Sequence, residues 1–221
     1  MRIVKNIFRT IWSIFLFIIL FFMIQTPALS RLSTDRISIS DNLVGDLERI
    51  LIFVLTFAIS LFLCLRYAKW LGLNVKFGDV TLTKKQWKQV AFWGFSHLLV
   101  LIISIIIISI YHQSGTSGEQ YSITRALMMA LTMTISAPLL EELLFRGILQ
   151  GICSRFSPTF ALILTTFLFA YAHGTTNLIF FGSHFFSGLI FGVLYMKVGK
   201  LFPSILVHSC GNAIICLLYF F

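Results

Sequence analysis

Long runs of apolar residues, separated by short polar stretches, are the dominant pattern along this chain. A helix crosses the hydrocarbon core of a bilayer with roughly 20 predominantly apolar residues and satisfies its own backbone hydrogen bonds there. The alternating ten-residue segments of a membrane barrel are not seen. We therefore predict an all-α integral membrane protein, a polytopic bundle of about seven transmembrane helices (six to eight). The predicted spans are residues 7–27, 50–66, 90–111, 124–149, 157–174, 176–196 and 201–221.

Composition supports the membrane class. Hydrophobic types make up 58% of the 221 residues and charged types only 11%, against about 25% charged residues in soluble domains. The four cysteines lie in or beside apolar blocks without a CxxC pair, which is typical of buried thiols and not of a disulfide framework or structural zinc site. These cysteines are Cys64, Cys153, Cys210 and Cys216.

The distribution of Lys and Arg predicts the orientation, because short loops rich in these residues stay cytoplasmic. The N-terminus and the loop 66–88 are basic, whereas the loop 112–122 has no Lys or Arg. We expect a multi-pass protein of the cell membrane with a cytoplasmic N-terminus and an external C-terminus. The first block, followed by "PALS" at 27–30, is interpreted as an uncleaved anchor, with a cleaved signal peptide as the alternative. The net charge of +9 then reflects topology and contact with anionic lipid, not nucleic acid.

Ionisable groups inside the apolar blocks are the candidates for function, since each costs about 2.5 to 3.5 kcal/mol at the centre of a membrane helix unless it is paired. The fourth block contains "EELLFR", with Glu141, Glu142 and Arg146. Glu142 and Arg146 are four residues apart, so they lie on one helix face and can pair. Glu141 is rotated by about 100° from that face. One carboxylate is therefore expected to be paired and the other to be available.

A single histidine and a second polar pair lie on other blocks. The fifth block ends with "FAYAH", Phe169 to His173, and the seventh contains "HSCGN", His208 to Asn212. A carboxylate, two imidazoles and an amide from three helices make a plausible hydrolytic site, in which a desolvated glutamate takes a proton from water. Histidine and asparagine side chains can donate hydrogen bonds to a developing oxyanion. A polar network that only locks the bundle is the structural alternative.

These motifs resemble the CAAX protease and bacteriocin-processing family of membrane proteins (CPBP, also called Abi), whose pattern is EExxxR, then FxxxH, then HxxxN, each on a separate transmembrane helix. All three motifs are present here in that order, over about 124–216. The resemblance divides the chain into N-terminal helices with a basic cytoplasmic loop, 1–123, and a catalytic core, 124–216. It implies an intramembrane endopeptidase, related to type II CAAX prenyl endopeptidases, that cuts a membrane-associated protein or peptide.

The resemblance also implies a role for each motif residue. Glu141 would be the general base that activates water, together with His173. His208 and Asn212 would form the oxyanion site. Glu142, Arg146 and Phe169 would support the site structurally. No cofactor is required in this scheme, although Glu141, His173 and His208 are also residue types that bind Zn²⁺.

Other interpretations stay open. His184, in the sixth block, and His97, in the third, match no motif. His184 is expected to form a hydrogen bond between helices, and His97 to be a packing or pore-lining residue. At the biological level, the family's association with bacteriocin gene clusters favours self-immunity or processing. A non-catalytic immunity or binding protein that keeps the fold is one alternative. A small transporter, in which intramembrane Glu and His relay protons, is another.

Overall fold

A computed structural model describes residues 2–26, 43–75, 79–111, 123–174 and 177–220 of the chain. These residues form helices and no strand, so the all-α prediction is confirmed. The helices in chain order are α1 (Arg2–Met23), α3 (Leu43–Trp70), α4 (Lys84–Tyr111), α5 (Ile123–Leu131), η1 (Thr132–Ser136), α6 (Ala137–Glu142), η2 (Leu143–Gln150), α7 (Gly151–Cys153), α8 (Pro158–Ala172), α9 (Leu178–Val198) and α10 (Leu201–Phe220). The segments 27–30 and 112–122, used above to predict the anchor and the orientation, lie outside the described residues.

Among the described residues, five helical segments are long and apolar enough to cross a membrane. One of them, Ala126–Cys153, is a continuous rod that passes through α5, η1, α6, η2 and α7. Half of the residues in its apolar stretch are buried inside the protein, against 17% for α3 and for α4, so it is the central helix of the bundle. The predicted span 157–174 forms α8, which at 15 residues is shorter than a full crossing.

The central rod is not a regular α-helix. Residues Thr132–Ser136 and Leu143–Gln150 are π-helical, with the short helix α6 between them. Both acidic residues of the first motif lie on α6, at its boundary with η2. The wider π-helical turns rotate the side chains that follow them relative to a regular α-helix, and such segments often occur at functional sites.

Capping residues set the ends of the two helices that face the rod. The side chains of Ser157 and Asn177 accept hydrogen bonds from the backbone N–H groups of Phe160 and Phe180, and so begin α8 and α9. Helix α9 ends at Gly199, whose φ of 72° lies in the left-handed region that glycine adopts without strain. Only this residue and Lys200 separate α9 from α10.

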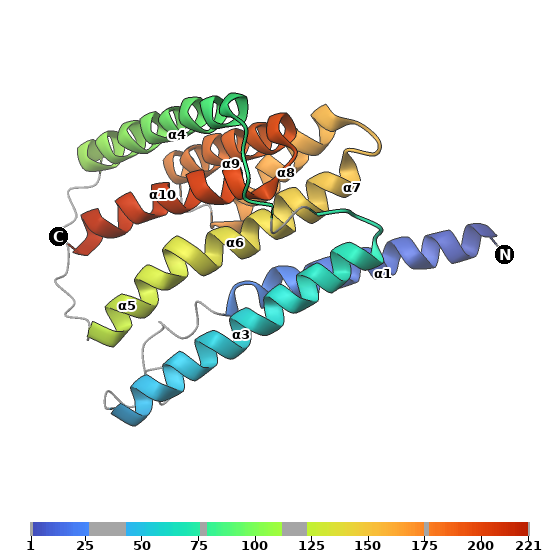
Figure 1. The fold of residues 1–221 in the computed structure, drawn as a ribbon, viewed down its shortest axis with the longest axis horizontal. Helices are drawn as coiled ribbons and strands as arrows, with labels where there is room; N and C mark the ends of the chain where they lie inside the picture. Colours follow the sequence, from blue (N-terminus) through green and yellow to red (C-terminus); the bar gives the residue numbers. More distant parts are fainter. Residues whose placement is uncertain (1, 27–42, 76–78, 112–122, 175–176, 221) are drawn as a thin grey trace.

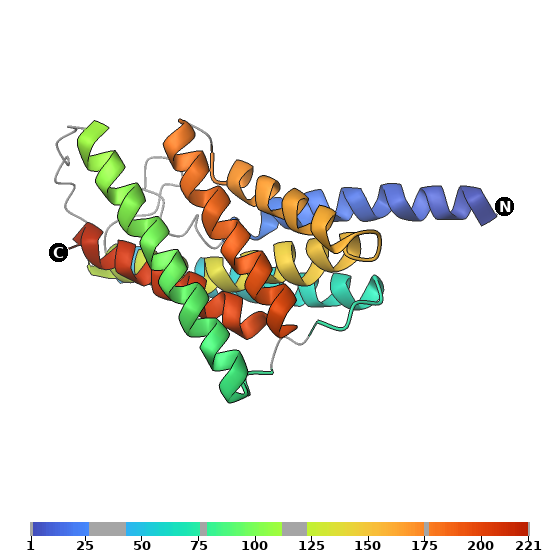
Figure 2. The same ribbon diagram turned by 90° about the horizontal axis from the view of Figure 1, so that it is seen from above.

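The helices are arranged around the central rod as Figures 1 and 2 show. Helices α1 and α3 pack along one side of the rod and share a first hydrophobic core with it. A second hydrophobic core, on the other side of the rod, joins it to α4, α8, α9 and α10. The start of α1 and the ends of α3 and α7 lie at one end of the bundle, with the C-terminus and the start of α5 at the other. Phe145, Phe169 and Phe191 of the second core surround the buried charges of the first motif.

Candidate functional site

Glu142 and Arg146 form a completely buried ion pair. The Nη1 atom of Arg146 donates to Oε1 of Glu142 over 3.0 Å, and neither side chain has exposed surface. Their spacing alone predicted this pair. The same carboxylate oxygen also contacts Nδ1 of His208 on α10, at 3.0 Å. Glu142 therefore joins two helices and does not serve Arg146 alone.

The guanidinium of Arg146 is held by backbone and aromatic groups as well as by Glu142. Its Nη2 donates to the carbonyl oxygen of Gly188 on α9 over 2.9 Å, and its Cζ lies 4.4 Å from the centre of the Phe169 ring. Cation–π contact with a desolvated ring is favourable. Phe169 therefore lies directly against the Arg146 guanidinium. A buried charge with these partners fixes the rod against α8 and α9.

Glu141 faces the two histidines. Its Oε2 atom lies 3.5 Å from Nε2 of His173 and 4.0 Å from Nε2 of His208, and it has no hydrogen-bond partner. Glu141 and His208 are buried, while the His173 side chain retains 25% exposure. The structure therefore brings Glu141, His173 and His208 together from α6, the end of α8 and α10.

The contacts of Nδ1 in His173 and His208 indicate which nitrogen of each ring carries the hydrogen. Nδ1 of His173 lies 2.8 Å from the carbonyl oxygen of Phe169, and Nδ1 of His208 lies against the Glu142 carboxylate. Because both partners accept, each Nδ1 carries the hydrogen. In the neutral rings both Nε2 atoms are then acceptors, and they face the Oε2 acceptor of Glu141. Three converging acceptors need a donor between them, such as a water molecule or one extra proton.

Asn212 lies one turn beyond His208 on α10, and its amide is engaged elsewhere. Its Nδ2 donates to the carbonyl oxygen of Met133 over 2.8 Å. Met133 belongs to the π-helical segment η1, where backbone hydrogen bonding departs from the regular α-helical pattern. Asn212 thus ties α10 to the central rod in this structure and is not one of the groups that contact Glu141 or His173.

Two histidines without a motif lie beside the site. The ring of His184 on α9 is stacked on His173, with centroids 4.3 Å apart and an interplanar angle of 23°, and its Nδ1 contacts the carbonyl oxygen of Phe180. His97 on α4 contacts Oγ of Ser187 over 3.2 Å and packs on Phe191. His97 is thus a satisfied packing residue, as expected, whereas the hydrogen bond described for His184 lies within its own helix and not between helices as expected. His184 instead supports His173, which its position in the sequence did not indicate.

Glu141, His173 and His208 are the residues whose side chains could bind Zn²⁺. Within the described part of the chain, no group of three or more His, Cys, Asp or Glu side chains is arranged to hold a metal ion. The carboxylate of Glu142 also occupies one nitrogen of His208, Nδ1, at 3.0 Å. In this structure Glu141, His173 and His208 are thus not arranged as a metal-ligand set.

The fold and the site together define a class: a multi-pass helical membrane protein with a buried cluster of two glutamates, an arginine and two histidines. Residues 123–214 match the family described as type II CAAX prenyl endopeptidase Rce1-like. The match covers the segment that carries the three motifs, so the resemblance that they indicated to the CAAX protease family is confirmed for residues 123–214.

Two curated proteins are similar to this chain. The UPF0177 protein YvdC of Lactococcus lactis subsp. lactis (strain IL1403) is 30% identical over 125 residues, which are 54% of this chain and 48% of that protein. An uncharacterized 24.3 kDa protein of Escherichia coli is 38% identical over 91 residues, 39% of this chain and 42% of that protein. This chain therefore spans about half the length of the curated relatives that it matches. No solved structure matches it.

Proposed function

We propose that this protein is an intramembrane endopeptidase that hydrolyses a peptide bond in a membrane-associated protein or peptide. The observation that carries the proposal is the convergence of Glu141 Oε2 with Nε2 of His173 and Nε2 of His208. A buried carboxylate oxygen without a hydrogen-bond partner is costly unless a ligand or water uses it. In this proposal residues 124–216 form the catalytic core, and residues 1–123 embed it in the membrane.

The proposed reaction uses a water molecule between Glu141 and His173. Glu141 takes a proton from the water, whose oxygen forms a bond to the carbonyl carbon of the substrate and gives a tetrahedral oxyanion. The carbon–nitrogen bond then breaks, and the proton passes from Glu141 or His173 to the leaving amine. The products are a carboxylic acid and an amine, and transfer of the acid's proton to the amine gives a carboxylate and an ammonium group, so atoms and charge balance. A positioned general base of this kind contributes roughly 10²- to 10⁴-fold to the rate.

Charge balance favours one protonated histidine during this reaction. Two ionised glutamates and Arg146 give the cluster one net negative charge, and a single imidazolium would neutralise it. A protonated His208 keeps Nδ1–H on Glu142 and gains an Nε2–H that can donate to the oxyanion. One hydrogen of the Asn212 amide is donated to the carbonyl oxygen of Met133. In the proposed oxyanion site, the second hydrogen of this amide donates to the oxyanion.

The test is the substitution Glu141→Gln, which keeps the shape of the side chain and removes the base. The full chain is reconstituted in lipid vesicles with prenylated and unprenylated membrane-anchored peptides, and products are identified by mass spectrometry. We expect cleavage by the unsubstituted protein and a loss of roughly 10²- to 10⁴-fold in Glu141→Gln. A chelator is added in a parallel series, where unchanged cleavage is expected.

The matched control is Glu48→Gln, because Glu48 is an exposed carboxylate on α3. Full cleavage by the control and none by Glu141→Gln supports the proposal. Retained cleavage in Glu141→Gln would remove Glu141 as the base.

Bacteriocin self-immunity or processing is the proposed physiological role, and it is tested by survival in a bacteriocin challenge. Normal protection by a Glu141→Gln/His173→Ala double variant would instead favour a non-catalytic immunity protein.

A further inference from the structure

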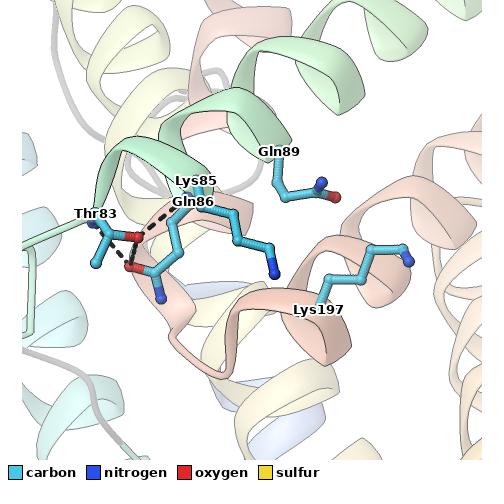
Figure 3. A pocket seen from close by; sticks show the side chains of 5 residues that line it. All are labelled: Thr83, Lys85, Gln86, Gln89 and Lys197. Carbon is cyan, nitrogen blue, oxygen red and sulfur yellow. Dashed lines mark hydrogen bonds between the residues drawn. The ribbon is translucent and has the colours of Figure 1, made fainter.

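A polar cavity lies where α4 begins and α9 ends, away from the glutamate and histidine site. Its volume is about 410 Å³, and each of its five lining residues has a polar group at the end of its side chain. The lining residues are Thr83, Lys85, Gln86, Gln89 and Lys197, shown in Figure 3. The amine of Lys85 and the amide of Gln89 point into the space between the two helices, beside Lys197. No motif residue of the proposed active site belongs to this cavity.

The walls of the cavity are held by hydrogen bonds. Gln86 accepts from the backbone N–H of Thr83 over 2.9 Å, Thr83 accepts in return from Gln86, and Gln86 Nε2 donates to the carbonyl oxygen of Val198 over 3.4 Å. Gln89 accepts from the indole N–H of Trp93. These contacts join the first turn of α4 to the last turn of α9, so the position of the two lysines does not depend on a free loop.

The charge of the cavity is positive and is not balanced by a carboxylate. Among the described residues, Lys85 and Lys197 take part in no ion pair, whereas the neighbouring Lys200 is paired with Asp79 over 2.9 Å. The hydrogen bond from Lys200 holds the pKa of Asp79 below its ordinary value, so this carboxylate stays ionised and committed to Lys200. The N-terminal end of α4 adds the positive end of a helix dipole.

The cavity also lies at the depth of lipid headgroups. Helix α4 begins at Lys84, and its apolar candidate span runs from there to Ile110. Trp87, in the first turn, is 47% exposed, and tryptophan is enriched at the membrane–water interface. Basic pockets between transmembrane helices at this level bind the headgroups of anionic lipids. A polar cavity with two unpaired lysines matches the charge and hydrogen-bonding capacity of a phosphodiester.

We propose that Lys85 and Lys197, with Gln86 and Gln89, bind the headgroup phosphate of an anionic phospholipid at the junction of α4 and α9. The two lysines neutralise the phosphate, and amide groups donate to its remaining oxygens. A bound lipid would hold α4 against α9, which carries Gly188 and packs against the central rod. The site is independent of catalysis, so it stands or falls separately from the proposed peptidase activity.

The test uses the purified full chain and native mass spectrometry with phosphatidylglycerol, phosphatidylcholine or inorganic phosphate as the probe. The variant is Lys85→Gln/Lys197→Gln. The matched control is Lys69→Gln/Lys88→Gln, which removes the same charge from exposed lysines that do not line the cavity. Since each lysine near a membrane surface contributes about fivefold to anionic-lipid binding, we expect at least a tenfold loss in the cavity variant.

We expect the unsubstituted chain and the control to retain phosphatidylglycerol. Phosphatidylcholine should bind weakly to the unsubstituted chain, to the cavity variant and to the control. Lys85→Arg/Lys197→Arg should keep binding, which separates charge loss from a folding defect. Equal loss in both Lys→Gln pairs would show only general attraction and overturn the proposal. Displacement of the lipid by millimolar inorganic phosphate would assign the cavity to a soluble phosphate compound and would equally overturn the lipid assignment.

Discussion

At the scale of single residues, two adjacent glutamates differ in their partners and should differ in what their loss does. Glu142 accepts from Arg146 and His208, whereas Glu141 Oε2 has no hydrogen-bond partner. Removing one member of a buried ion pair leaves the other charge uncompensated, at a cost of about 3–5 kcal/mol. Glu141 has no arginine partner, and its 3.5 Å contact with His173 is an ion pair only when that histidine is protonated.

We therefore predict that Glu142→Gln lowers the free energy of unfolding by about 3–5 kcal/mol. Glu141→Gln should leave it within about 1 kcal/mol while it abolishes cleavage, because its loss affects the base and not a structural contact. Denaturant or thermal unfolding in detergent, measured on both variants and the unsubstituted chain, gives the comparison. Equal destabilisation by the two substitutions would mean that both acids are structural.

His184 gives a second prediction at this scale. Its ring lies flat on His173, which also donates to the carbonyl oxygen of Phe169, packs on the Phe169 ring and contacts Glu141. Without the stacked ring, His173 can turn its Nε2 away from Glu141. A displacement of this kind reduces a reaction rate roughly ten- to hundredfold. We expect this loss in kcat for His184→Ala.

A flat ring at position 184 should restore the support. His184→Phe is therefore expected to keep most of the cleavage rate, although it cannot donate or accept a hydrogen bond. Both variants should unfold at a similar denaturant concentration, since His184 is only half-buried. If phenylalanine and alanine are equally impaired, His184 acts through its own nitrogens and not by stacking.

At the scale of elements, close contact between η2 and α9 depends on two glycines. Arg146 and Gln150, one turn apart on η2, donate to the carbonyl oxygens of Gly188 and Gly192, one turn apart on α9. A Cβ atom on Gly192 would lie 2.5 Å from Cδ1 of Leu162 and 3.2 Å from Oε1 of Gln150. The absence of side chains thus allows polar groups of one helix to reach the backbone of the other.

Gly192→Ala should lower the free energy of unfolding by about 1–3 kcal/mol, because the inserted methyl group overpacks against Leu162 of α8 and Gln150 of η2. Gly182→Ala is the matched control on the same helix, since a Cβ there meets nothing within 4 Å. The control is expected to gain about 0.5–1 kcal/mol from the higher helix propensity of alanine. Equal effects of the two substitutions would show that α9 and η2 do not approach as closely as described.

What the sequence could predict also differs between elements. Apolar runs located the helices, and a spacing of four residues identified the Glu142–Arg146 pair, because both depend on local periodicity. The contact of His208 with Glu142 and that of Asn212 with Met133 join residues far apart in the chain. Such contacts depend on how the helices pack. The π-helical turns of the central rod likewise have no signal in its composition.

At the scale of the whole molecule, the orientation in the membrane is a prediction that rests on charge. The start of α1 and the ends of α3 and α7 lie together at one end of the bundle, and the positive-inside rule places that end in the cytoplasm. The loop between α7 and α8 would then be cytoplasmic, and the start of α9 would be external.

Phe156 and Leu178 form a matched pair for testing this orientation, because each is 87% exposed and each lies next to a helix end. We expect a cysteine at 178 to react with a membrane-impermeant maleimide in intact cells. A cysteine at 156 should react only after permeabilisation, because the apolar membrane excludes the charged reagent. The unsubstituted chain, with its own four cysteines, sets the background. The reverse labelling pattern would invert the topology, place the lysine-lined cavity of α4 and α9 outside the cell, and require anionic lipid in the outer leaflet for that site.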